Sequence, residues 1–152
     1  MSASAQYCSF RLGAAEYALD VADVQEVLRG LEWSPVPLAP ASVIGLMNLR
    51  GQIVTVVDLA KLLGLEIEPG APIPAPRDIH IVLSGPRPPL SFAVDEIGEV
   101  LAIETTSLLA PPSTLSPAVR ACVRGLHLAD QRLITILETR VLLEALMQPE
   151  LA

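Results

Sequence analysis

An internal repeat is the feature of this chain that most constrains its fold. Residues 43–63 can be placed over residues 123–143 with a shift of 80 positions and no gap. The identical pairs are Val43/Val123, Gly45/Gly125, Leu46/Leu126, Thr55/Thr135, Leu62/Leu142 and Leu63/Leu143. Because most of the remaining aliphatic positions are also matched, the register indicates a duplicated structural unit. Chance similarity between two aliphatic hairpins is the alternative.

The repeat extends upstream of these segments. Glu26-Val27-Leu28 matches Glu99-Val100-Leu101, and Ala18-Leu19-Asp20 matches Ala93-Val94-Asp95. Each copy is predicted to hold a strand–turn–strand unit, a single strand, and a hairpin leading into a short helix. Two copies of such a unit favour a duplicated small β-barrel.

Alternating and β-branched runs predict strands at 7–12, 17–21, 43–49, 52–57, 79–84, 90–94, 123–128 and 132–137. Asp58 is a predicted N-cap for a short helix ending at Gly64, and residues 139–147 predict a C-terminal helix. The proline-rich segment 69–76 reads as a connector. We therefore predict one domain over 6–147, with a first barrel half at 6–68 and a second at 77–147.

Composition excludes several classes of function. The net charge is −7, Lys61 is the only lysine, and aromatic residues make up 3% of the chain, which disfavours nucleic acid and anionic lipid as partners. No run is apolar enough to insert into a membrane. Two distant cysteines, Cys8 and Cys122, predict reduced thiols and a cytoplasmic protein.

A search for catalytic residues finds little. His80 and His127 lie within apolar strands and are expected to be structural residues with satisfied hydrogen bonds. Neither has Cys, Asp or Glu nearby at the spacing of a metal site. We therefore expect no enzyme activity, no cofactor and no metal.

Two surface features stand out instead. Asn48-Leu49-Arg50-Gly51 would place an arginine at a rigid hairpin tip, whereas the second copy has Leu128-Ala129-Asp130-Gln131 there. In the segment 23–27, Val24 shares a face with Val27 if it is helical and with Glu26 if it is a strand. A solvated turn arginine and a core strand with a solvated acid are the plain alternatives.

These residues carry a resemblance to a known family. The run from Val43 through Asn48-Leu49-Arg50-Gly51 to Leu59, followed by Leu63-Gly64, resembles the CheW family of chemotaxis coupling proteins. The opening segments Phe10-Arg11-Leu12-Gly13 and Val24-Gln25-Glu26-Val27, and the central Val94-Asp95-Glu96-Ile97, are also similar. The similarity covers roughly residues 6–147.

The resemblance implies a mainly β fold of two tandem five-stranded SH3-like barrels with short helices and a C-terminal helix. It implies a non-catalytic adaptor between the cytoplasmic tip of a methyl-accepting chemoreceptor and the regulatory domain of a CheA-type histidine kinase. The receptor's helical hairpin is expected in an apolar groove between the barrels, and the kinase at the barrel ends. The expected receptor-binding residues are Val24, Glu26, Val27, Gly45, Asn48 and Arg50.

A small-molecule-binding β-barrel, or an enzyme, is the alternative from another class. It would need a buried polar pocket, and the sequence offers no cluster of residues to build one. The sequence also leaves open whether strands are exchanged between the two barrels.

Overall fold

The structure, a computed structural model, describes residues 4–37, 39–65, 77–86 and 88–147. The strands in these residues are β1 (Ser4–Leu12), β2 (Ala15–Asp20), β3 (Val24–Arg29), β4 (Val43–Leu49), β5 (Gln52–Asp58), β6 (Ile79–Leu83), β7 (Leu90–Val94), β8 (Glu96–Glu104), β9 (Val123–Ala129) and β10 (Arg132–Leu137). The helices are α1 (Leu59–Leu62), α2 (Pro117–Ala121) and α3 (Thr139–Met147), with two 3-10 turns at Val21–Asp23 and Thr105–Ser107.

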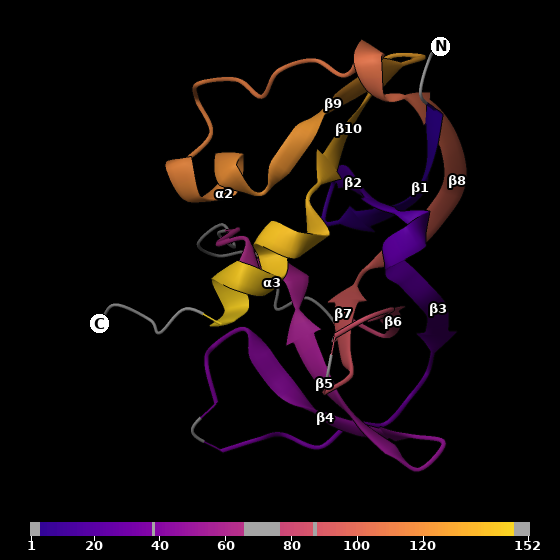
Figure 1. The fold of residues 1–152 in the computed structure, drawn as a ribbon. Helices are drawn as coiled ribbons and strands as arrows, with labels where there is room; N and C mark the ends of the chain where they lie inside the picture. Colours follow the sequence, from indigo (N-terminus) through magenta and orange to yellow (C-terminus); the bar gives the residue numbers. More distant parts are fainter. Residues whose placement is uncertain (1–3, 38, 66–76, 87, 148–152) are drawn as a thin grey trace.

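The strands form two five-stranded sheets. Sheet A has the order β8-β1-β2-β10-β9 and sheet B the order β3-β6-β7-β5-β4. Figure 1 shows them as two lobes, with α3 beside the junction. The architecture is mainly β and SH3-like, as predicted.

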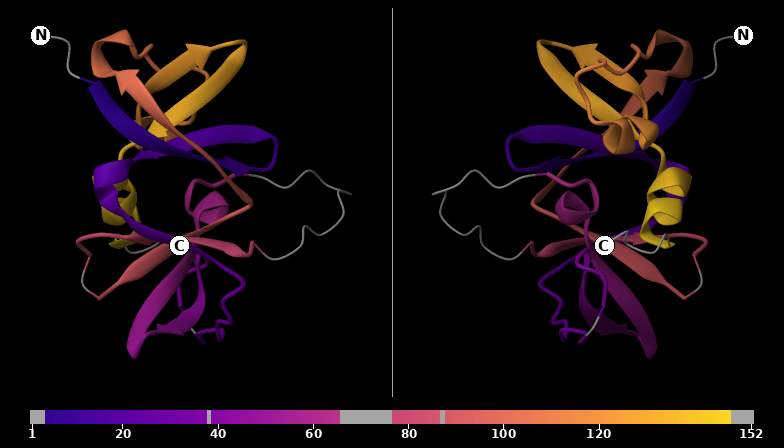
Figure 2. Two further views of the ribbon diagram at one scale, coloured as in Figure 1. Left: turned by 90° about the vertical axis from the view of Figure 1, so that its right-hand side faces the viewer. Right: turned by 90° about the vertical axis from the view of Figure 1, so that its left-hand side faces the viewer.

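The two sheets do not follow the two halves of the sequence. Sheet A takes β1 and β2 from the first half and β8, β9 and β10 from the second, while sheet B takes β6 and β7 from the second half and β3, β4 and β5 from the first. The copies therefore exchange their first hairpins, and both views in Figure 2 show the chain crossing repeatedly between lobes. The predicted barrel halves 6–68 and 77–147 do not coincide with the sheets, because parallel pairing joins β2 to β10 and β7 to β5.

Backbone geometry repeats between the two copies. Both tight turns use positive φ, at Arg50 and Gly51 in one copy and at Asp130 and Gln131 in the other. The Asp58 N–H donates to the Ser42 carbonyl at 2.8 Å, and 80 residues later the Glu138 N–H donates to the Cys122 carbonyl at 2.7 Å. The strand pairs also show which residues of the first hairpins are equivalent in the two copies. Cys8 pairs with Leu19 in the first copy, and Ile81 pairs with Phe92 in the second.

This equivalence of strand pairs corrects one part of the alignment between the two copies. Because Cys8/Leu19 and Ile81/Phe92 are equivalent pairs, Ala18 is equivalent to Ser91 and Asp20 to Ala93. The alignment of Ala18-Leu19-Asp20 with Ala93-Val94-Asp95 is therefore displaced by two residues.

Three apolar clusters hold the molecule together. The interior of the barrel formed by sheet A is filled by Tyr7, Ala18, Ile103, Ile134 and Ile136. The interior of the barrel formed by sheet B is filled by Met47, Val54, Val56, Val82 and Ala93. The largest cluster draws Phe10 and Leu19 from sheet A, Ile81 and Phe92 from sheet B, and Leu142 from α3. Burial of these side chains stabilises each barrel and fixes one barrel against the other. The deep part of the seam is thus packed core rather than an open groove.

Capping residues set where the short helices α1 and α2 begin. Asp58 accepts a hydrogen bond from the Lys61 N–H and starts α1, and α3 has the predicted bounds. Helix α2, which was not predicted, begins with Ser116 as N-cap and a proline in its first turn. Cys8 and Cys122 are free and buried, as expected.

Candidate functional site

The hairpin β4–β5 presents Arg50 at a turn whose shape is fixed locally. Arg50 has φ 52° and Gly51 has φ 85°, the left-handed backbone that a two-residue type I′ turn requires. The Gly51 N–H donates to Asn48 Oδ1 at 3.0 Å, which closes the turn. Asn48 therefore supports the position of Arg50.

Arg50 meets Glu26 of β3 through two parallel hydrogen bonds. Arg50 Nη1 donates to Glu26 Oε1 at 2.7 Å, and Nη2 donates to Oε2 at 2.8 Å. The Arg50 side chain is 67% exposed but that of Glu26 is only 22% exposed, because the guanidinium covers the carboxylate. The structure thus joins two predicted site residues that lie 24 positions apart.

The ion pair shifts the titration of both groups. Hydrogen bonds from Arg50 lower the pKa of the Glu26 carboxyl, and a hydrogen bond from the Gln25 side chain acts in the same direction. The same contacts with Glu26 raise the pKa of Arg50. A lowered carboxyl pKa means that the pair forms fully at neutral pH and is lost as the pH falls through that pKa.

A β-bulge in β3 places Val24 on the same face of the strand as Val27. The register against β6 shifts between Val24 and Glu26, so Gln25 is an extra residue. Val24 and Val27 consequently both pack against the core between the sheets, while Glu26 reaches Arg50. The segment is a strand, yet Val24 and Val27 contact the same cluster, because the bulge interrupts strand alternation.

Gly45 lies beneath a covering segment rather than at the surface. A Cβ on Gly45 would lie 2.4 Å from Trp33 Cε3 and 2.6 Å from the Ser34 carbonyl oxygen. Ser34 and Leu46 exchange backbone hydrogen bonds of 2.8 Å beside it. Gly45 therefore permits the close approach of residues 33–34, and any influence on a partner would act through that segment.

Two hollows flank sheet B, and the smaller of them is lined by Gln25 and Leu49, the sequence neighbours of Glu26 and Arg50. The smaller, about 250 Å³, is lined by Gln25, Leu49, Gln52, Val54, Val82, Leu83, Gly85, Pro86 and Pro89. The larger, about 400 Å³, is lined by Pro40, Val43, Thr55, Pro86, Pro88, Leu90, Leu143 and Leu146. They share Pro86, but Val54 lines the first and Thr55 the second, and consecutive residues of a strand point to opposite faces of its sheet.

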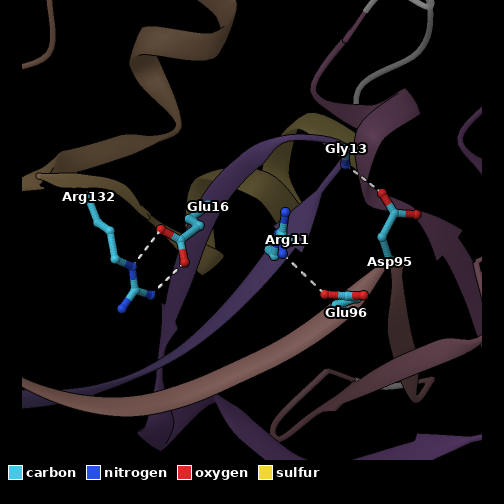
Figure 3. Close-up of polar contacts among 6 residues, drawn as sticks. All are labelled: Arg11, Gly13, Glu16, Asp95, Glu96 and Arg132. Carbon is cyan, nitrogen blue, oxygen red and sulfur yellow. Dashed lines mark hydrogen bonds and ion pairs between the residues drawn. The ribbon is translucent and has the colours of Figure 1, made fainter.

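The corresponding surface of sheet A is built differently. Asp130 takes the turn position of Arg50, and the arginines pair across the sheet instead: Arg132 with Glu16 and Arg11 with Glu96 (Figure 3). The Gly13 N–H donates to Asp95 Oδ2 at 2.6 Å in the same view. Sheet A thus carries a comparable arginine–glutamate fork, Arg132 with Glu16, but its arginine follows the turn, whereas Arg50 lies within the turn.

Sequence reasoning missed several residues that line the two hollows. Gln25 and Gln52 lie in segments that carry the family resemblance but were not among the candidate site residues, and neither were Pro86 and Pro88. The apolar side of the C-terminal helix was a usable signal, since Leu146 belongs to it and lines the larger hollow.

No group of three or more His, Cys, Asp or Glu that could hold a metal occurs among the described residues. In the same part of the chain, no helix is both long and apolar enough to cross a membrane.

These features define a class of protein: a double SH3-like barrel with filled interiors and an exposed, preorganised polar–apolar surface. The CheW-like domain model matches residues 6–147. The chain belongs to the CheW-like family, whose members are chemotaxis adaptor and scaffold proteins.

Individual relatives agree with this assignment. The chain is 30% identical to the probable chemotaxis protein CheW of Rhizobium etli over 137 residues, which covers 88% of this chain and 84% of that protein. It is 28% identical to chemotaxis protein CheW of Rhizobium meliloti, covering 86% and 81%. The crystal structure of the scaffolding protein TtCheW from Thermoanaerobacter tengcongensis superposes with a TM-score of 0.73 at 29% identity, covering 91% and 90%.

Proposed function

We propose that this chain is a cytoplasmic, non-catalytic adaptor that couples the cytoplasmic tip of a methyl-accepting chemoreceptor to the regulatory domain of a CheA-type histidine kinase. The observation that carries the proposal is the preorganised Arg50–Glu26 fork of sheet B, together with a mainly apolar hollow beside α3 in the same lobe. A receptor helix would lay its apolar face in the hollow beside α3. Arg50 would offer its remaining N–H donors to an acceptor on that helix, because a guanidinium has five.

A second surface, on the other sheet, suits the kinase. Leu128 and Leu133 are cross-strand neighbours on β9 and β10, with 60% and 50% of their areas exposed. Two exposed leucines side by side add to an apolar surface that a partner protein could cover. In Figure 1 the β9–β10 and β4–β5 hairpins belong to opposite lobes. One chain could therefore hold both proteins at once, and its effect would be to favour one receptor–kinase arrangement over another.

A pair of charge-introducing variants tests this assignment. We expect Arg50→Asp to weaken capture of a purified receptor-tip fragment about tenfold or more, because it removes the donors and places an acid beside Glu26. Leu133→Asp should weaken capture of the kinase regulatory domain instead, since it places a charge on the β9–β10 surface. Pull-down of each partner, with folding checked by circular dichroism, measures both. Unchanged receptor capture by folded Arg50→Asp protein would remove Arg50 from the receptor surface.

A further inference from the structure

Arg124 of β9 lies at the centre of a cluster of polar side chains in sheet A. Its Nε donates to Glu138 Oε1 at 2.8 Å, and its Nη2 donates to the same oxygen. Its Nη1 donates to the Tyr7 hydroxyl at 3.0 Å and lies 3.5 Å from Asp20 Oδ2. One guanidinium thus joins β9 to β1, to the end of β2 and to the residue that precedes α3.

This cluster has the character of a fixed network rather than of a surface ion pair. The side chains of Arg124, Glu138 and Asp20 are mostly covered by the protein. Hydrogen bonds to Glu138, and a further one to Tyr7, raise the pKa of Arg124 above its ordinary value. An isolated surface pair contributes little, whereas several partly buried partners hold a side chain in one arrangement.

One partner of Arg124 stands at the start of α3. The Glu138 carbonyl accepts a hydrogen bond from the Leu142 N–H at 3.1 Å, in the first turn of the helix. Leu143 and Leu146 of the same helix line the hollow in which the receptor helix is proposed to bind. The place of these two leucines therefore depends on how the first turn of α3 is held.

Another partner stands at the start of the segment that leads to the Arg50–Glu26 fork. Asp20 Oδ1 accepts a hydrogen bond from the Ala22 N–H at 2.9 Å and caps the 3-10 turn at Val21–Asp23. Strand β3, which carries Glu26, begins directly after that turn. Arg124 is thus attached to both segments that carry the proposed receptor surface.

The first copy of the repeat has a different arrangement at the equivalent place. Ile44 occupies the position of Arg124, and Asp58, the equivalent of Glu138, pairs with Arg77 instead. The helix that follows Asp58 has only four residues, whereas α3 has nine. The link centred on Arg124 therefore accompanies the longer helix, the one that lines the hollow.

We propose that Arg124 is a positioning residue for the receptor surface: through Glu138 and Asp20 it holds α3 and the turn before β3 in the places that a receptor helix requires. The inference rests on the proposed function, because the receptor is the partner considered. Arg124 itself belongs to β9, the strand that carries Leu128 of the proposed kinase surface. Receptor binding, and not kinase binding, then depends on a residue of the kinase-side hairpin.

The test compares the affinities of the full chain for a purified receptor-tip fragment and for a purified kinase regulatory domain, both from the same organism, by calorimetry. Arg124→Met keeps an unbranched apolar stem and removes the guanidinium. We expect it to weaken receptor binding about fivefold or more and to leave kinase binding unchanged. Arg124→Lys, which keeps a charge near Glu138, should recover part of the loss. Arg140→Met is the matched control, since Arg140 pairs only with Glu144 of the same helix among the described residues, and it should bind both partners like wild type.

A second substitution tests the route through Asp20. Asp20→Asn keeps an oxygen to cap the 3-10 turn and removes the charge that faces Arg124. Alone it should weaken receptor binding and spare kinase binding, and it carries the same test if Arg124→Met does not fold. Added to Arg124→Met, it should cost almost no further receptor affinity, because the pair is already broken.

The outcomes separate the two proposals. If Arg50→Asp loses the receptor fragment but folded Arg124→Met and Asp20→Asn bind it as tightly as wild type, the positioning role is wrong and the receptor surface stands. Equal losses of receptor and kinase binding would also overturn it, because they would show a general effect on folding. A wild-type chain that binds no receptor fragment overturns both proposals.

Discussion

At the scale of single residues, the interiors of the two barrels differ at the position of Tyr7 and His80. Tyr7 and His80 occupy equivalent places in the strand pairs, and both are fully buried. The Tyr7 hydroxyl accepts a hydrogen bond from Arg124 at 3.0 Å, but Ile44 takes the place of Arg124 in the first copy. Neither ring nitrogen of His80 has a partner among the described residues. The expectation of a satisfied histidine was therefore wrong, because its satisfaction depends on a residue of a distant strand.

His80 makes stability depend on pH. Burial lowers the pKa of His80, and the charge of nearby Asp78 acts in the opposite direction without cancelling the effect of burial. The unfolded chain then binds the proton more readily, so stability is full above about pH 6.5 and falls as the pH drops below it. Relative to His80→Leu, the wild-type free energy of unfolding should decrease by up to about 1.4 kcal/mol per pH unit. Urea denaturation between pH 7.5 and 5 measures this, with His127→Leu as control. Parallel pH profiles for wild type and His80→Leu would contradict it.

At the scale of elements, an arginine links the start of α1 to the turn of the first hairpin. Asp58 caps α1, and its Oδ2 pairs with Arg77 Nη1 at 3.2 Å. Arg77 Nε lies 3.1 Å from Asp95 Oδ1, and Asp95 Oδ2 accepts from the Gly13 N–H. The chain of contacts therefore joins sheet B to the β1–β2 hairpin of sheet A. Arg77 and Asp58 are largely buried, so this link is shielded from solvent.

Two substitutions at Asp58 separate its roles. Asp58→Ala removes both the helix cap and the partner of Arg77, and we expect it to cost about 2–4 kcal/mol of stability. Asp58→Asn keeps an oxygen for the cap and loses the charge, so its cost should be clearly smaller. Chemical denaturation of both variants gives the comparison. Equal losses for the two would mean that the cap contributes nothing.

Elements were predictable wherever their cause is local. Both hairpins of the repeat, the Asp58 cap and the bounds of α3 follow from alternation, turn residues and capping within a few positions. The bulge at Gln25 was not predictable, because it depends on pairing with β6, more than 50 residues away. The same holds for the site: the Arg50 tip followed from its motif, whereas its pairing with Glu26 needed the assembled sheet.

At the scale of the whole molecule, exchange of the first hairpins makes the two sheets interdependent. The sequence pattern that forms each hairpin is local. Which sheet a hairpin joins is decided by the parallel strand pairs β5·β7 and β2·β10. No local sequence signal specifies those partners, so the repeat predicted two barrels and left their exchange open. The apolar cluster between the sheets is consequently built from both halves of the chain.

This exchange predicts how separated halves behave. Fragments 1–68 and 77–152 should each fail to unfold cooperatively, because each holds incomplete parts of both sheets. When mixed, they should regain strand content and a cooperative transition by circular dichroism. A half that folds alone to a stable barrel would contradict the exchanged topology.

The most direct test of the adaptor function is quantitative affinity purification of the tagged chain from its native cells. We expect wild-type protein to retain both a chemoreceptor and a histidine kinase, and Arg50→Asp to retain the kinase while losing most of the receptor. Recovery of neither partner with wild-type protein, together with thermal stabilisation by a metabolite, would contradict the account and favour a ligand-binding barrel.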